Sequence, residues 1–271
     1  MKTFLAIKPV WFLALALVPI LSNAQGTGEV EAIYEDPDGA VIDRAGNALA
    51  LAVGDKLQDG DIIKSNDSTV MVRLCDESLA TIYPKSEVTF TGIGTGMVRM
   101  GLLTGELLGD TSPTDNCDLT VGTLAGTVNV GVGIYGVVMV EGPDFWTMQV
   151  RNLDGTVSVT GADNLDTSKL TVSLIEAGEI VDIPAGEEFV CYGIYDVDGD
   201  IFALTGPVTG IALIPEDVKL GMNEDVTRMS SIGRQGPPEQ LPPTDRPYET
   251  PAGPVLEKIP WPDFEPASDP G

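Results

Sequence analysis

Short β-prone runs separated by turn residues make up most of this sequence, and this pattern limits the fold more than any other feature. Val70, Val72 and Leu74 alternate with the residues between them, which is the two-residue period of a strand with two unlike faces. Long stretches with a helical spacing of apolar residues are missing, so we predict an all-β fold. The further β-prone runs are Glu87–Phe90, Leu119–Val121, Thr127–Val130, Gly136–Val140, Trp146–Val150, Thr156–Thr160, Leu170–Ile175 and Glu179–Ile183.

Asp-Gly dipeptides punctuate these runs, and their backbone preferences suit the tight turns of β-hairpins. We expect a turn at each of Pro37-Asp38-Gly39, Asp59-Gly60, Asp154-Gly155 and Asp198-Gly199. Outside the N-terminal segment, helix is indicated at two places, Glu216–Leu220 and Glu224–Met229. Residues 215–232 are therefore predicted to form a short helical or irregular linker.

Residues 1–24 have the three regions of a secretory signal peptide. Lys2 and Lys8 supply positive charge, the stretch from Pro9 to Leu21 is apolar, and small residues precede a cleavage site after Ala24. The apolar run is shorter than the roughly 20 residues that span a bilayer. We predict a bacterial protein that is periplasmic or secreted, with no membrane insertion after cleavage. The competing interpretation is that this segment is retained as an anchor.

Residues 233–271 differ in composition from the rest of the chain and contain eleven prolines. Proline fixes φ and removes a backbone donor, so this tail is predicted to be extended or disordered. The folded region is expected within residues 25–214, which is long enough to enclose one substantial core.

Acidic residues far outnumber basic ones, with 41 Asp and Glu against 15 Lys and Arg and a net charge of -26. This balance disfavours nucleic acid, because phosphates are bound through Lys and Arg. It also disfavours anionic membrane surfaces. Three interpretations of the acidity remain, namely high solubility, calcium binding and a cationic partner.

Three cysteines, Cys75, Cys117 and Cys191, are compatible with one disulfide in an oxidising compartment. We favour the pair Cys75–Cys117; the alternative is three separate thiols. The chain has no histidine, which excludes Cys–His metal sites and the Ser–His or Cys–His nucleophile pairs. The protein is therefore predicted not to be an enzyme. A glycosidase-like pair of carboxylates is neither supported nor refuted in so acidic a chain.

Alternate aspartates at Asp196, Asp198 and Asp200 flank a glycine and could converge oxygen ligands on calcium. An EF-hand would also need a distal bidentate acid, and none lies at that spacing. The competing interpretation is a solvent-facing hairpin turn. No other cofactor is expected.

The segment from Gly131 to Gly136 spells G-x-G-x-x-G, the pattern of a dinucleotide-binding loop. Such a loop leads into a helix, whereas here a strand-like run from Val137 to Val140 follows. We predict instead that these glycines allow strands to turn or to approach closely.

A series of short motifs follows in a fixed order between about residues 53 and 186. The motifs are Gly54-Asp55 with Gly60-Asp61, Leu74-Cys75-Asp76-Glu77-Ser78, Ala80–Ser86, Leu103-Thr104-Gly105-Glu106-Leu107, Leu153–Val159 and Glu176-Ala177-Gly178-Glu179. In this order they resemble the motifs of the FecR domain. Gly126-Thr127 stands near that family's Arg-Gly-Thr-x-Phe segment, although Ala125 and Asn129 replace the Arg and the Phe.

The resemblance implies short strands stacked in a roll-like or solenoid-like domain, with a β-sandwich as the alternative. Such a domain presents flat faces suited to a protein or cell-wall polysaccharide partner, so we expect a non-catalytic binding module. The best-known FecR proteins control a sigma factor across the inner membrane through an anti-sigma segment and a membrane helix. Here the resemblance begins soon after the signal peptide, so that role carries over only if the N-terminal anchor is retained. A carbohydrate-active enzyme and a self-assembling surface protein with exposed strand edges are further alternatives.

Overall fold

The computed structural model describes residues 28–36, 39–94, 96–115, 117–142, 145–162, 178–195, 201–204 and 210–232. Over these residues the chain forms fifteen strands and one helix, which confirms the predicted all-β class. The elements are β1 (Gly28–Tyr34), β2 (Val41–Arg44), β3 (Asn47–Ala50), β4 (Ile62–Lys64), β5 (Thr69–Leu74), β6 (Ser78–Ile82), β7 (Glu87–Thr91), β8 (Met97–Thr111), β9 (Asp118–Gly122), β10 (Gly126–Glu141), β11 (Phe145–Gly161), β12 (Ile180–Ile183), β13 (Glu187–Tyr195), β14 (Ile201–Leu204), β15 (Ile211–Leu213) and α1 (Glu216–Ile232).

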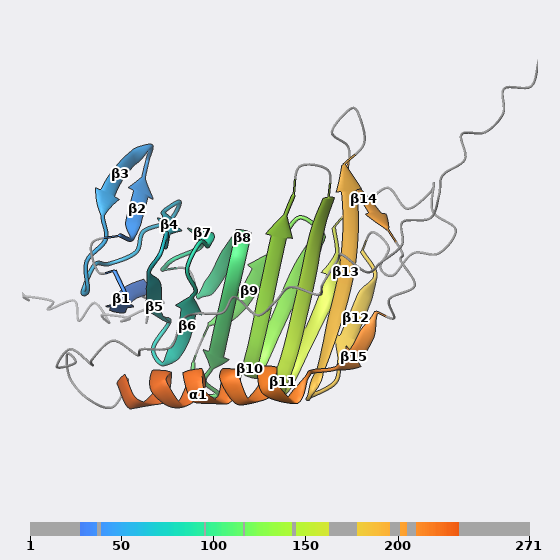
Figure 1. Ribbon diagram of the computed structural model, residues 1–271. Coiled ribbons are helices and arrows are strands. Elements are labelled where there is room, and N and C mark those ends of the chain that lie inside the picture. Colours follow the sequence, from blue (N-terminus) through green and yellow to red (C-terminus); the bar gives the residue numbers. More distant parts are fainter. Residues whose placement is uncertain are drawn as a thin grey trace, which may run out of the picture.

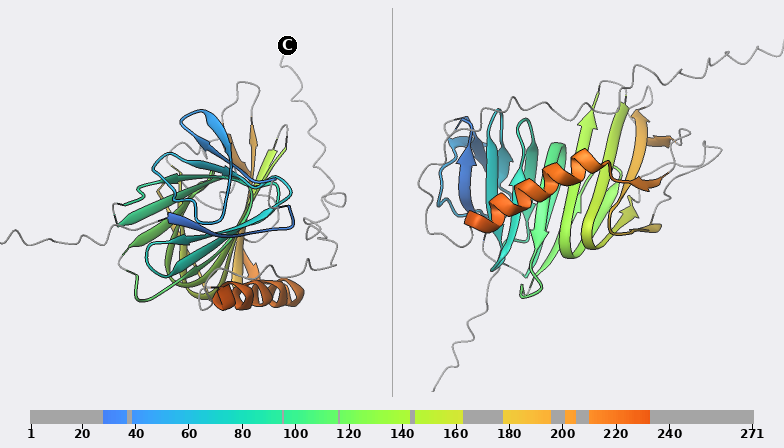
Figure 2. Two further views of the ribbon diagram at one scale, coloured as in Figure 1. Left: turned by 90° about the vertical axis from the view of Figure 1, so that its left-hand side faces the viewer. Right: turned by 60° about the horizontal axis from the view of Figure 1, so that its bottom comes forward.

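The strands belong to one sheet that folds over on itself into a roll with two layers (Figures 1 and 2). We call the layer with β2, β3, β4, β7, β9 and β12 the groove layer, and the layer with β1, β5, β6, β13, β14 and β15 the helix layer. The long strands β8, β10 and β11 run through both. In β8, residues 99–104 pair with β7, whereas residues 107–110 pair with β6. The connection of the layers through shared strands distinguishes this roll from a sandwich of two separate sheets.

Glycines and bulges let the long strands bend between the layers. Gly133 of β10 and Gly155 of β11 lie opposite each other, and the register shifts beside them. Their φ angles are 141° and 94°, and a Cβ atom on either would clash with the backbone of the other strand. Gly105, with φ 97°, lies at the bend of β8, so glycine is required at all three positions.

The main hydrophobic core fills the space between the layers. Val88 and Phe90 of β7 are fully buried, while Thr89 between them faces outward. Tyr135 of β10 and Trp146 of β11 enter the same core from the helix layer. Burying a large apolar side chain contributes roughly 1.5–3 kcal/mol, so the two-residue period decides which face of each strand is inward.

The helix α1 lies diagonally across the outer face of the helix layer (Figure 2). Val218, Met222, Val226 and Met229 follow one another at helical spacing and form the apolar side of the helix. They pack on a second hydrophobic cluster, whose buried residues outside the helix are Ala32, Met71, Leu79, Tyr83 and Leu108. Residues 216–232 are therefore one continuous helix, where the sequence indicated two short helical stretches within a linker, and this helix forms part of the folded body.

The prediction of a hairpin turn at Asp154-Gly155 was wrong, because both residues lie inside β11 at its bend. For the same reason, pairs of predicted short strands on either side of the bends are joined into β10 and β11. Asp59-Gly60 does form a turn, with Gly60 at a φ of 88°. The predicted strand Leu170–Ile175, Asp198-Gly199, residues 1–24 and residues 233–271 lie outside the described residues.

Candidate functional site

Polar residues and two glycines form two rows across the outer face of the groove layer, at right angles to the strands. The first row, from β7 to β10, consists of Thr91, Arg99, Thr120 and Asn129. The second row lies two residues along each of the same strands, on the same face of the sheet. It consists of Thr89, Gly101, Gly122 and Thr127. We call the surface that these eight residues form the hydroxyl groove. Its strands β8 and β9 are parallel, whereas β7 and β10 are antiparallel to their neighbours.

Glycines at the centre of the second row hollow this surface, and a groove of about 700 Å³ lies over the two rows. A Cβ atom on Gly122 would meet only the Met100 carbonyl oxygen, at 3.9 Å, so the space above Gly122 is open. On Gly101 a Cβ atom would clash with the Thr89 hydroxyl, which lies 3.4 Å from the Gly101 carbonyl oxygen. The floor of the groove is therefore backbone, with hydroxyl groups at its sides.

The groove carries almost no net charge on a strongly acidic protein. Among its lining residues, Arg99 and Asp118 are charged, one with each sign. The rest are small, hydroxyl, amide or aliphatic, and none is aromatic. Asn129 donates a hydrogen bond to the Thr160 hydroxyl at 2.9 Å, which fixes its amide on this face. The surface can thus both donate and accept hydrogen bonds without imposing a charge preference.

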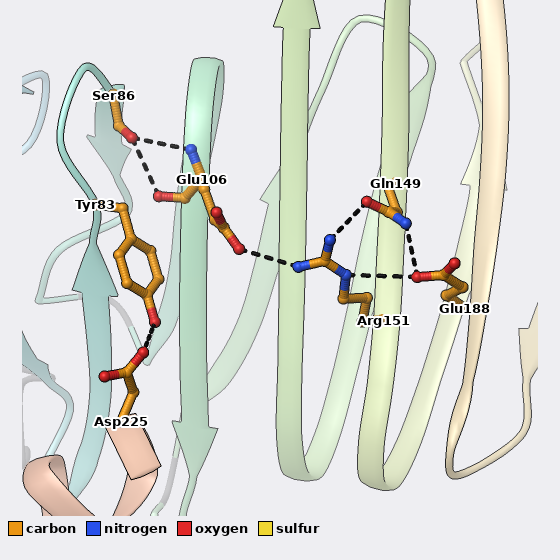
Figure 3. Close-up of polar contacts among 7 residues, drawn as sticks. All are labelled: Tyr83, Ser86, Glu106, Gln149, Arg151, Glu188 and Asp225. Carbon is orange, nitrogen blue, oxygen red and sulfur yellow. Dashed lines mark hydrogen bonds and ion pairs between the residues drawn. The ribbon is translucent and has the colours of Figure 1, made fainter. Parts of the chain in front are cut away.

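A second polar group, the arginine cluster, consists of Glu106, Gln149, Arg151 and Glu188 on the helix layer (Figure 3). Arg151 Nη1 lies 3.0 Å from Glu106 Oε1, and Arg151 Nε lies 3.5 Å from Glu188 Oε2. Gln149 accepts a hydrogen bond from Arg151 Nη2 at 2.8 Å and donates one to Glu188 at 2.6 Å. The cluster therefore joins β8, β11 and β13.

Burial governs the electrostatics of the arginine cluster. It raises the pKa of Glu106 above its usual range, against the lowering effect of Arg151 and together with the nearby Asp225 carboxylate. Burial likewise raises the pKa of Glu188, against the lowering effects of Arg151 and Gln149. The Arg151 side chain is only 7% exposed, and its guanidinium contacts the side chains of Glu106, Gln149 and Glu188. The arrangement connects strands and leaves no room for a ligand at the guanidinium.

The helix α1 is held beside this cluster by polar and apolar contacts. The Tyr83 hydroxyl donates a hydrogen bond to Asp225 of α1 (Figure 3). Gly136 of β10 provides space, because a Cβ atom there would lie 3.3 Å from Met222 Cε and 3.8 Å from Arg151. The last glycine of the G-x-G-x-x-G segment therefore makes close packing over a strand possible, and the whole segment lies within β10.

Cys75 and Cys117 form a disulfide with Cα atoms 6.2 Å apart, which is the pairing favoured from the sequence. Cys191 is a buried free thiol. Next to the disulfide, the Asp115 carboxylate accepts hydrogen bonds from the backbone amides of Glu77 and Ser78, each at 2.7 Å. The disulfide and Asp115 together fix the turn between β5 and β6.

The proposed calcium ligands Asp196, Asp198 and Asp200 lie outside the described residues, so that site stays a prediction. In the part of the chain that the structure describes, no group of three His, Cys, Asp or Glu side chains is placed to hold a metal ion. No helix within the same residues is long and apolar enough to cross a membrane.

The runs predicted as strands include four of the eight groove residues, Thr89, Thr120, Thr127 and Asn129, but periodicity did not predict the groove. Thr89, Thr120 and Thr127 occupy alternate positions in runs predicted as strands, so their outward direction was a readable signal. The pairing of β9 between β8 and β10 brings them together, and a parallel neighbour 21 residues away in the chain carries no local sequence signal.

Together the fold and this surface define an all-β roll with a neutral, hydrogen-bonding groove on one face and a packed helix on the other. No family model matches the chain, and no curated protein sequence matches it. The resemblance to the FecR domain therefore stays a prediction.

Proposed function

We propose that this chain is an exported, non-catalytic binding module of the FecR type, which holds a protein or polysaccharide partner of the bacterial envelope in the hydroxyl groove. The observation that carries the proposal is the hollow floor at Gly122, which lies among hydroxyl and amide groups of the two rows. A concave surface with convergent polar groups is the usual form of a binding site.

The positions of the FecR-like motif residues support the structural part of the proposal. Gly54 and Gly60 have φ angles of 90° and 88° at turns, and Gly105 lies at the bend of β8. The Ser86 hydroxyl accepts a hydrogen bond from the Glu106 amide at 2.9 Å and donates one to the Glu106 carbonyl at 3.1 Å. These residues determine where the chain turns, which is the role that the resemblance implies for them.

The experiment that tests the proposal fills the groove without disturbing the fold. Gly122→Leu places a side chain in open space, and Gly122 does not need a positive φ. The matched control is Thr147→Leu, which adds a leucine to β11 where it runs in the helix layer. Both variants are compared with the wild type for retention on washed bacterial envelope material.

We expect the wild type and Thr147→Leu to be retained equally, and Gly122→Leu to lose at least about 90% of the retention, a change of about 1.4 kcal/mol or more. Circular dichroism and thermal unfolding establish that both variants are folded. Equal retention of all three proteins would show that the groove is not the binding site.

A further inference from the structure

We infer that the partner in the hydroxyl groove is an uncharged polysaccharide in an extended conformation, lying across the strands from β7 to β10. This inference rests on the proposed function, because it names the chemical class that the same groove would bind. Three observations carry it: the charge of the groove, the spacing of its polar rows, and its place in the interior of the sheet.

The charge of the groove separates neutral from charged polymers. The chain has a net charge of -26, which repels acidic polysaccharides. A cationic partner would be attracted to acidic surfaces, yet the groove has one arginine and one aspartate, Arg99 and Asp118. Its neutral lining therefore favours a ligand that offers hydrogen bonds rather than charge.

The spacing of the rows suits a chain of sugar residues. Neighbouring strands lie about 4.8 Å apart, so the polar groups of the first row repeat at that interval across the face. This interval is close to the advance of one sugar residue along an extended glycan. In the first row, Thr91, Arg99, Thr120 and Asn129 would each meet a successive sugar. The hydroxyl and amide groups can both donate and accept hydrogen bonds, and Arg99 can donate them.

The place of the groove in the sheet argues against a peptide. Peptides commonly bind by adding a strand to an exposed sheet edge, or by inserting apolar side chains into pockets. The strands β8 and β9 under the groove have hydrogen-bonded neighbours on both sides, so their backbones offer no edge. The floor at Gly122 is open backbone, where an apolar pocket would need a large side chain.

The lack of an aromatic residue among the lining residues of the groove limits the affinity that we expect for the polysaccharide. Without ring stacking, the affinity comes from several hydrogen bonds that replace those with water, and each of these contributes little. We expect a dissociation constant for one short oligosaccharide on the order of 0.1–1 mM. Long polymers would be held more firmly, because each presents many equivalent segments.

The test is affinity electrophoresis of the folded protein in gels that contain one soluble polysaccharide each. The neutral probes are hydroxyethylcellulose, glycol chitin and soluble starch, and the acidic probes are alginate and polygalacturonate. We expect the wild type to be retarded by at least one neutral polymer and by neither acidic one. Gly122→Leu should reduce this retardation about tenfold and Asn129→Ala about threefold, whereas Thr147→Leu should leave it unchanged.

Two outcomes would overturn the inference. The first is retardation by the acidic polymers at least as strong as by the neutral ones. The second is no retardation in any neutral gel while envelope retention still depends on Gly122; the proposed function would then survive with a different partner. If protease treatment of the envelope material abolishes the Gly122-dependent retention, that partner is a protein. Failure of the proposed function itself differs from both, because Gly122→Leu would then be retained like the wild type.

Discussion

The guanidinium of Arg151 on β11 reaches across β10 to the carboxylate of Glu106 on β8, with Nη1 and Oε1 3.0 Å apart. The strand between them has Gly136 directly opposite Arg151, and the missing side chain leaves the path open. Because the same guanidinium also meets Glu188 on β13, one buried arginine links three strands of the helix layer. The cluster therefore connects the strands of the helix layer on the side of the roll opposite the hydroxyl groove.

Replacing Arg151 should therefore lower the stability of the fold. Arg151→Met leaves Glu106 and Glu188 largely buried without their cation, and breaking a buried ion pair in this way costs about 3–5 kcal/mol. We expect the free energy of unfolding in urea to fall by that amount. The control is Arg99→Met, an exposed arginine of the same sheet, for which a change within about 0.5 kcal/mol is expected. Similar losses for both variants would contradict the structural role of the cluster.

The raised pKa of Glu106 predicts a pH dependence of stability. A carboxyl whose folded pKa is raised binds more protons in the folded than in the unfolded state, so its contribution is fully present below the unfolded pKa of about 4.3. That contribution is lost as the pH rises through the folded pKa. Glu106→Gln has no such titration, so the unfolding free energy of the wild type minus that of the variant should decrease from pH 4 to pH 7. Urea unfolding of both proteins at several pH values measures this difference. A difference that stays constant or increases with pH would refute the raised pKa of Glu106.

The helix α1 should contribute to stability through its methionines. Met229 is fully buried against the helix layer, and truncating a buried methionine to alanine costs about 2–5 kcal/mol. We expect Met229→Ala to lower the unfolding free energy by an amount in this range. Leu220→Ala on the same helix is the control, because Leu220 is 58% exposed and should change stability by about 0.5 kcal/mol or less. Equal effects would mean that α1 does not pack as described.

The disulfide should stabilise the fold by restricting the unfolded chain. Cys75 and Cys117 are 42 residues apart, and closing a loop of that length contributes about 4 kcal/mol in the chain-entropy model. We expect the double variant Cys75→Ala/Cys117→Ala to lose most of this stability in urea unfolding. Adding a reductant should lower the stability of the wild type but not of the double variant. A wild type that does not respond to the reductant would contradict the pairing.

The sequence was sufficient for the class of the fold and for the inward faces of several strands. The alternation around Val72 and the glycine-rich turns follow from local backbone preferences, which act over a few residues. Asp154-Gly155 was misjudged because a glycine with positive φ serves a bend inside a long strand as well as a hairpin turn. Local sequence does not distinguish the two, since the choice depends on the partner strand.

The docking of helix α1 could not be predicted from the sequence for a different reason. Met222 and Met229 lie at helical spacing, so the apolar side of α1 was readable, but its docking on Leu79 and Leu108 depends on contacts more than 100 residues away in the chain. The groove has the same origin, because its rows exist only once β9 pairs with β8 and β10. Long-range pairing of this kind cannot be inferred from periodicity alone.

The most direct test of the central claim is nuclear magnetic resonance of the ¹⁵N-labelled protein during titration with a hexasaccharide of whichever neutral polymer retards it. The account predicts that the amide signals of Gly101, Thr120, Gly122 and Asn129 shift most, and that those of α1 and of Arg151 stay in place. Shifts concentrated on α1 or on the arginine cluster, with the hydroxyl groove unchanged, would contradict it.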